Sequence, residues 1–116
     1  MNWQPDENEY HSEQLRDPLS RIAHGDNANG QILASYIAKY FVDMWKHLRG
    51  IREVLAPGAR VHYIVGNSIF YGVLLSVERI YADMLARLGL KDINIRPVRK
   101  RNSKKELVEF DVSACW

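Results

Sequence analysis

The first half of the chain carries one long apolar pattern with helical spacing. Apolar residues recur at intervals of three and four, which places a wide apolar stripe along one side of a long helix. The stripe consists of Ile32, Leu33, Tyr36, Ile37, Tyr40, Phe41, Met44, Trp45, Leu48, Ile51 and Leu55. Asp26, Asn27 and Asn29 are candidates for the N-cap, and Pro57 ends the helix because proline disfavours the α conformation in the preceding residue. We expect this helix to pack against a sheet.

Residues 60–65 follow this helix and have the composition of a strand. They are rich in β-branched and aromatic residues, with a Pro-Gly turn before them and Gly66 after them. Their nearly continuous apolar character predicts burial on both faces of a sheet. A second amphipathic helix then ends at Gly89, a suitable C-terminal cap, and its apolar face is formed by Leu74, Val77, Ile80, Tyr81, Met84, Leu85 and Leu88.

The chain closes with two alternating segments, residues 93–98 and 108–112. The polar residues 101–105 between them predict a hairpin. Pro97 cannot donate a hydrogen bond to a neighbouring strand, so it implies an edge strand or a bulge. The order is therefore helix, strand, helix, strand, strand. The crossover through the second helix makes the first two strands parallel, and the last strand returns antiparallel.

Residues 1–25 differ from the rest of the chain in being polar and interrupted. Pro5, Pro18 and Gly25 act as breakers, which predicts an arm or loop with at most one short turn of helix. We therefore divide the chain into a polar N-terminal arm, 1–25, and one domain, 26–116. The arm still has apolar residues that could dock on the domain, namely Tyr10, Leu15, Leu19 and Ile22.

Composition restricts the setting in which the chain works. Its 116 residues are 47% apolar, which is typical of one globular domain. The 16 basic and 14 acidic residues leave a formal charge of +2, too small to direct the whole molecule to nucleic acid or anionic lipid. Cys115 is the only cysteine, which favours a reducing compartment. With an acidic N-terminus and no apolar run of membrane-spanning length, we predict a cytoplasmic protein without membrane contact.

Specific residues give this order of elements a family resemblance. The Leu55–Ala56–Pro57–Gly58 turn leads directly into the first strand, which continues as Gly66–Asn67–Ser68 with Gly72 beyond it. The second helix ends at Leu88–Gly89–Leu90 and the hairpin follows. This arrangement resembles the C-terminal half of class I S-adenosylmethionine-dependent methyltransferases. It is most similar to DNA methyltransferases that modify the amino groups of adenine or cytosine, over roughly residues 31–114.

The resemblance implies a specific α/β fold. It predicts a three-stranded mixed sheet, half of a Rossmann-like methyltransferase fold, with two long helices on one face. The last strand of the hairpin would lie between the other two, so that the spatial order is first, third, second.

The cofactor-binding half of that family has no counterpart in this sequence. The family binds S-adenosylmethionine with a glycine-rich turn after its first strand, and its amino-group DNA enzymes add a Pro-Pro motif. No Pro-Pro dipeptide occurs here, and Gly25–Gly30 has no strand before it. We therefore predict a truncated or split DNA methyltransferase fragment of a restriction–modification type, inactive alone and without a bound cofactor.

Gly66–Asn67–Ser68 is the candidate loop on the active-site side, because open α/β sheets bind ligands where their parallel strands end. A structural role competes with this interpretation. Gly66 allows a tight exit from the strand, and Asn67 or Ser68 can bond backbone groups or cap the next helix. We assign no catalytic or metal-binding residue, since no motif spacing pairs a nucleophile or metal with His11, His24, His47 or His62.

The hairpin concentrates positive charge and suggests a second class of function. Its cations could contact phosphates, which would make the chain a small nucleic-acid-binding or protein-interaction module. The alternative is a solvated hairpin whose charges protect the sheet edge. The six cations are Arg96, Arg99, Lys100, Arg101, Lys104 and Lys105.

The absent half also predicts self-association. In the complete fold, the strand at 61–65 is paired on both edges, and helices of the other half cover the second face of the sheet. An unpaired edge and an uncovered apolar face are typical interfaces. We therefore expect a homodimer, with the arms exchanged as one route, or a complex with a complementary methyltransferase half.

Overall fold

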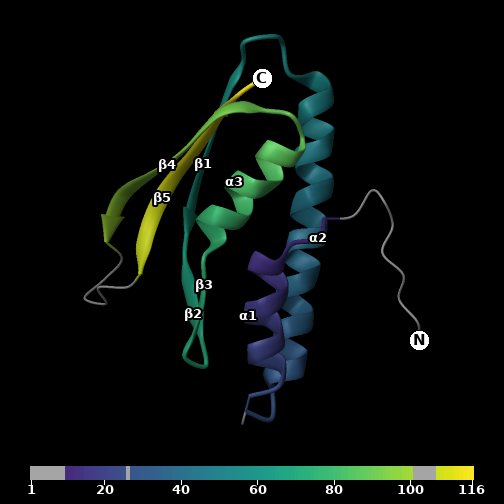
Figure 1. Ribbon diagram of the computed structural model, residues 1–116, viewed down its shortest axis with the longest axis vertical. Coiled ribbons are helices and arrows are strands. Elements are labelled where there is room, and N and C mark those ends of the chain that lie inside the picture. The colour runs from purple at the N-terminus through teal and green to yellow at the C-terminus, as the bar shows by residue number, and fades with distance from the viewer. Residues whose placement is uncertain (1–9, 26, 101–106) are drawn as a thin grey trace.

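The computed structural model describes residues 10–25, 27–100 and 107–116. Within these ranges the chain forms three helices and five strands, with three strands in a main sheet, two in a separate hairpin, and all three helices on one side of the main sheet (Figure 1). The helices are α1 (Glu13–Ala23), α2 (Gly30–Val54) and α3 (Val77–Arg87). The strands are β1 (Arg60–Gly66), β2 (Ser68–Phe70), β3 (Val73–Leu75), β4 (Lys91–Lys100) and β5 (Val108–Cys115).

The main sheet has three strands in the order β1-β5-β4, as predicted. The prediction of a mixed sheet is wrong, because both hydrogen-bonded pairs, β1 with β5 and β4 with β5, are antiparallel. The crossover through α3 does give β1 and β4 the same direction. However, β5 enters between them, so these two strands never pair with each other.

Tyr63 of β1 fixes both long helices to one face of the sheet. Its ring centroid lies 6.4 Å from that of His47 in α2 and 5.6 Å from that of Tyr81 in α3. The prediction that both helices share a face is therefore confirmed. Beneath α3, Val112 of β5 is completely buried, as is Met84 of the helix. This helix–sheet layer forms the core.

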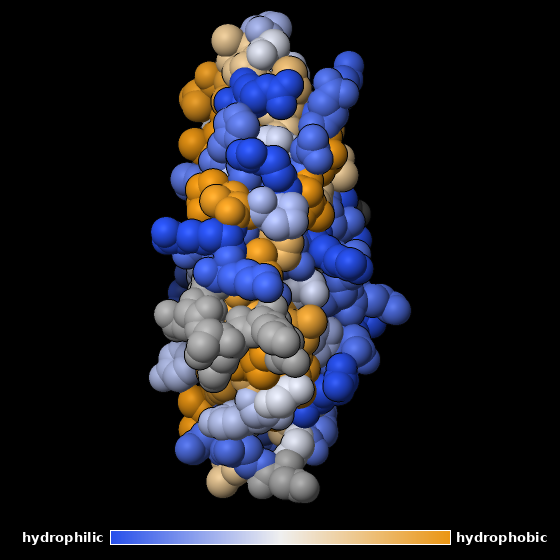
Figure 2. Space-filling model, turned by 90° about the vertical axis from the view of Figure 1, so that its left-hand side faces the viewer, coloured by the Kyte–Doolittle hydropathy of each residue, from blue (hydrophilic) through white to orange (hydrophobic). Residues whose placement is uncertain are grey.

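The other face of the sheet is polar and open to solvent. Burial alternates along β1, so that His62 and Ile64 are exposed while Tyr63 and Val65 are partly buried. The predictions that this strand is buried on both faces and that the uncovered face is apolar are therefore wrong. Apolar residues appear on this side of the molecule only as separate patches among hydrophilic ones (Figure 2). A face of this kind needs no cover.

The predicted arm contains an 11-residue helix, α1, so the expectation of a loop is wrong. Ser12 caps it by accepting a hydrogen bond from the Gln14 N–H at 3.1 Å. Leu15, Pro18 and Ile22 form its buried side. The docking of apolar residues from this segment is confirmed, but α1 packs against α2 on the helical side, away from the polar face.

Tyr10 fastens the start of this segment to the rest of the fold. Its hydroxyl donates to the Asp83 carboxylate in α3 at 2.6 Å, and its ring lies 5.3 Å from that of Trp45 in α2. Burial is the main reason that the pKa of Tyr10 lies above its usual range. The phenol therefore stays neutral and can keep this hydrogen bond.

A short β2–β3 hairpin separates β1 from α3, where the sequence predicted a loop and the first turn of the helix. Tyr71 and Gly72 form its two-residue turn with φ of 50° and 78°, the left-handed values that such hairpins need. Consequently α3 begins at Val77 and Leu74 is half exposed in β3. The C-terminal end of α3 was predicted correctly. Gly89, at φ 92°, ends α3 in a Schellman-type turn in which Leu90 N–H donates to Leu85 O at 3.1 Å.

Candidate functional site

A groove of about 500 Å³ lies between α2 and the extended segment formed by β1 and β2. From α2 it is lined by Tyr36 and Tyr40, and from the sheet side by Tyr63 and Val65. Ile64 also lines the groove although its side chain belongs to the polar face, so the hollow extends to the backbone edge of β1. Among the residues that the structure describes, no strand pairs with this edge. The groove therefore combines an apolar surface with free backbone hydrogen-bonding groups.

Two tyrosines of the groove, Tyr63 and Tyr81, have pKa values above their usual range. The hydroxyls of Tyr40 and Tyr81 are 2.5 Å apart, and burial, followed by this hydrogen bond, raises the pKa of Tyr81 above its usual range. Burial also raises the pKa of Tyr63. These shifts favour the neutral phenols, so these groups attract an apolar or hydrogen-bonding ligand rather than a cation.

Gly66, Asn67 and Ser68 lie at one end of this groove, and Gly66 and Ser68 line it. Asn67 is only 6% exposed. Its side-chain Oδ1 accepts from the backbone N–H of Val108 at 2.8 Å, and its own N–H donates to the Val108 carbonyl at 3.3 Å. These bonds attach the end of β1 to β5, which is the structural role considered for this residue. The assignment of the loop to an active site stays a prediction.

The predicted phosphate-binding cations are partly engaged with carboxylates. Arg99 Nε lies 2.9 Å from Glu109, and the Arg96 guanidinium lies 3.4 Å from Asp111. Lys100 is exposed at the end of β4. The remaining three, Arg101, Lys104 and Lys105, lie outside the described residues. Two carboxylates among these cations reduce the local positive potential, and nucleic-acid binding by this hairpin stays a prediction.

A histidine from β1 joins the same polar network. His62 Nδ1 is 3.0 Å from the Asp111 carboxylate, which also faces Arg96. The hydrogen bond from His62 is the main reason that the pKa of Asp111 lies below its usual value, with Arg96 adding to the effect against desolvation. The three side chains cross all three strands on the open face. They form a structural ladder on a flat surface rather than a site enclosed from water.

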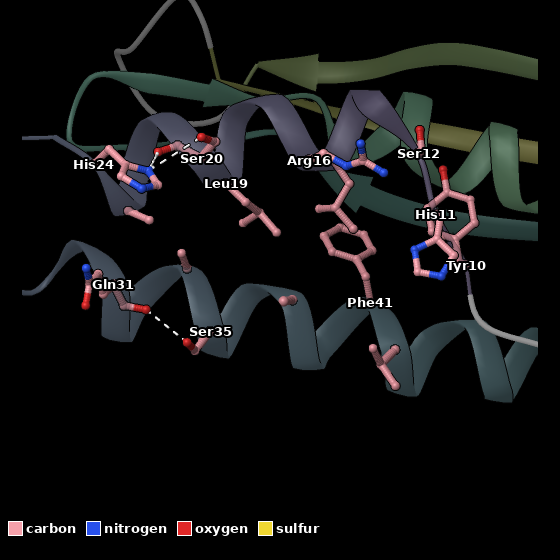
Figure 3. A pocket seen from close by; sticks show the side chains of 15 residues that line it. Tyr10, His11, Ser12, Arg16, Leu19, Ser20, His24, Gln31, Ser35 and Phe41 are labelled. Carbon is pink, nitrogen blue, oxygen red and sulfur yellow. Dashed lines mark hydrogen bonds between the residues drawn. The ribbon is translucent and has the colours of Figure 1, made fainter. Parts of the chain in front are cut away.

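A second hollow of about 640 Å³ lies between α1 and α2 (Figure 3). Leu19 and Phe41 point into it from the two helices, with polar side chains around the rim. Several of these polar groups are bonded within their own helices. His24 Nδ1 lies 2.9 Å from Ser20 O, and Ser35 Oγ donates to Gln31 O at 3.0 Å. This hollow shows no set of polar groups converging on a ligand, so we do not place the function here.

The described part of the chain contains no cluster of three or more side chains suited to hold a metal ion. In the same residues, no helix has the length and apolar character needed to cross a bilayer.

The groove residues of α2 were not singled out from the sequence. Tyr36 and Tyr40 belong to the apolar stripe and were expected to be buried, yet they are 70% and 46% exposed. Their spacing is the signal that could have indicated exposure. Ile32, Tyr36 and Tyr40 form one line at the margin of an apolar stripe that is too wide to be covered by one packing surface.

Comparison with protein-family models, with curated proteins and with solved structures gave no match to this chain.

Proposed function

We propose that this chain is the C-terminal half-domain of a class I methyltransferase-like unit of the kind that modifies amino groups of DNA. It acts when a cofactor-binding half is supplied, either by another polypeptide or by a further part of a longer chain. The strand order carries this proposal. An antiparallel β5 between two strands of the same direction, with the preceding helix α2 and the following helix α3 on one face of β1, is the arrangement that the resemblance implies.

The turn between α2 and β1 supports the same interpretation. Gly58 of the Leu55–Pro57–Gly58 turn has a φ of 82°, which explains why glycine is needed there. Its N–H donates to the Trp116 carbonyl at 2.9 Å, and Trp116 N–H donates to Ala59 O at 2.8 Å. The turn therefore ends α2 and also binds the residue that follows β5.

The open β1 edge is where a cofactor-binding half would join this chain. That half would bring the glycine-rich turn and the Pro-Pro motif, which this sequence lacks. This chain would contribute the groove, with Gly66 and Ser68 at its end beside the joined half. We place this function in the cytoplasm, in line with the single cysteine.

Calorimetry with S-adenosylmethionine tests the proposal in two steps. The chain alone should give no binding heat at micromolar concentrations. The neighbouring reading frames should include one with a glycine-rich strand-to-helix turn and a Pro-Pro motif, and its co-expressed product should co-purify with the chain and bind the cofactor. Micromolar binding by the chain alone would contradict the proposal. If the chain is not part of a longer protein, the absence of these motifs from the neighbouring reading frames would also contradict it.

The nucleic-acid module is the weaker alternative, because carboxylates pair with two of its cations. It predicts a mobility shift with short duplex DNA that weakens steeply with salt and disappears in the Arg99→Ala/Arg101→Ala variant. We expect the unmutated chain to give no such shift.

A further inference from the structure

We infer that the open edge of β1 is a homodimer interface, at which a second copy of this chain adds its own β1 antiparallel to form a continuous six-stranded sheet. This inference concerns the chain by itself and does not rest on the proposed function. A methyltransferase half would occupy the same edge, so the dimer forms only where that half is absent.

Among the described residues the outer edge of β1 has no partner strand, and it is geometrically regular. β1 pairs with β5 without interruption, from Arg60 opposite Cys115 to Gly66 opposite Glu109. Every second residue of an antiparallel strand directs its N–H and C=O to one neighbour, and the residues between direct theirs to the other side. Since β1 contains neither a proline nor a bulge, its outer groups form an intact template for one more strand.

The surface beside the edge carries several exposed apolar and aromatic side chains. Tyr36 and Tyr40 of α2 border the groove, and Ile32 continues their line by one turn at 58% exposure. Ile64 is 60% exposed on the strand itself. A stable protein interface buries about 800 Å² on each partner, more than a seven-residue strand edge provides alone. The tyrosines and Ile32 supply the additional contact area.

The sequence of β1 fits a second copy of itself in one register. With Tyr63 on the two-fold axis, Val61 lies opposite Val65 of the second copy, and His62 lies opposite its Ile64. Arg60 then lies opposite Gly66 of the second copy. All pairs on the groove side are apolar or aromatic, and no cation faces another cation. Such a strand pair incurs no like-charge penalty.

These observations favour a second copy over an unrelated partner. Any partner must offer a straight extended segment that is uncharged on the side facing the groove. β1 meets this requirement through Val61, Tyr63 and Val65. The polar face of the sheet and the docking of α1 on its own chain remove the other routes to dimerisation that the sequence suggested.

Sedimentation of the full chain tests the interface. The unmutated chain should be a dimer at micromolar concentration. Ile64→Lys and Tyr36→Lys should each weaken the dimer at least about tenfold, because both place a charge at the contact of exposed side chains. Val98→Lys, on the opposite edge of the sheet, and Val54→Lys, at the far end of α2, replace similarly exposed apolar residues and should have no effect.

Disulfide cross-linking tests the register, with Cys115→Ser in every variant. A mixture of His62→Cys and Ile64→Cys chains should cross-link at least about fivefold faster than either variant alone, since directly opposite residues suit a disulfide and diagonal ones are too far apart. A Val98→Cys chain measures random collision. A monomeric unmutated chain, a dimer that resists both lysine variants, or a mixture no faster than its components would overturn the inference.

Discussion

The two edges of the three-stranded sheet are built in opposite ways. β4 carries Pro97, and its register against β5 shifts twice, between Lys91 and Asn94 and between Pro97 and Arg99. It also has cations along its length, including Lys100 at its end. β1 has neither a proline nor a register shift, and its only lysine or arginine is Arg60 at its first position.

This contrast shows that the chain can protect a strand edge and does so on one side only. Prolines, bulges and charged side chains are the usual means by which proteins prevent edge-to-edge pairing. Their concentration on β4 keeps that edge in water, as the sequence predicted from Pro97. Their absence from β1, together with the tyrosines beside it, indicates an edge that binds another strand.

Removing the protection of β4 should have the largest effect. The Pro97→Val/Lys100→Val variant restores a donor and removes a cation from the open edge. We expect its solubility to fall about tenfold or more, because a second edge then accepts strands and open-ended association becomes available. Light scattering against protein concentration measures this. The Lys39→Val/Lys46→Val variant on exposed positions of α2 should remain soluble, and equal loss in both variants would mean that charge alone matters.

Asn67 sharpens the comparison, since it holds the end of β1 straight against β5. Asn67→Ala leaves the Val108 N–H without its side-chain acceptor. An unsatisfied donor costs about 1–3 kcal/mol when it is buried, and this one is partly buried, so the free energy of unfolding should fall by about 1 kcal/mol. Urea denaturation measures it, with Ser68→Ala as the control. An unchanged midpoint for Asn67→Ala would show that this residue is kept for a role other than stability.

Acid should weaken the ladder that joins β1 to β4 across the open face. The pKa of Asp111 is lower in the folded chain, chiefly through His62, so the carboxylate adds stability above its unfolded pKa. That stability is lost as the pH falls through the lowered pKa. Between pH 7 and pH 3, Asp111→Asn should therefore lose less stability than the unmutated chain. Parallel declines in urea titrations would show that the ladder does not contribute.

The smallest effect is expected at the pair formed by Arg99 and Glu109. The Arg99 side chain is 72% exposed, and an ion pair with one partner so open to solvent contributes little even though Glu109 is partly buried. Arg99→Ala should leave the urea midpoint unchanged within error and leave the oligomeric state as it is. A clear loss of stability would show that charge on β4 supports the fold as well as protecting the edge.

The main elements could be predicted from the sequence because their patterns are local. The stripe of α2, the alternation of β4 and β5 and the Gly89 cap each follow from spacing or turn chemistry within one segment. The strand order came instead from the family resemblance and agrees with the structure. Both strand pairs in the sheet are antiparallel because β5, which runs opposite to β1 and β4, lies between them.

The errors have a common cause, which is that neighbours distant in sequence decide the outcome. Pro18 reads as a breaker, yet α1 continues through it, and Pro18 shares the buried side of the helix with Leu15 and Ile22. Tyr71–Gly72 is not a strong hairpin signal, so β2 and β3 were missed. The apolar run of β1 did not reveal that the face of the strand that carries His62 is exposed to solvent. To predict the groove, one would have to know which margin of the α2 stripe lies beside β1.

The central position of β5 has a consequence for how the chain is made. Both pairings of the sheet require β5, which follows β1 and β4 along the chain. Protein synthesis adds about 5–20 residues per second, so β1 waits for seconds without any strand partner while the residues up to β5 are added. In that interval only contacts among the elements already made, such as α1 with α2 and β2 with β3, can form. The nascent chain therefore leaves both edges of β1 unpaired, and this is the stage at which the strand is most open to wrong pairing.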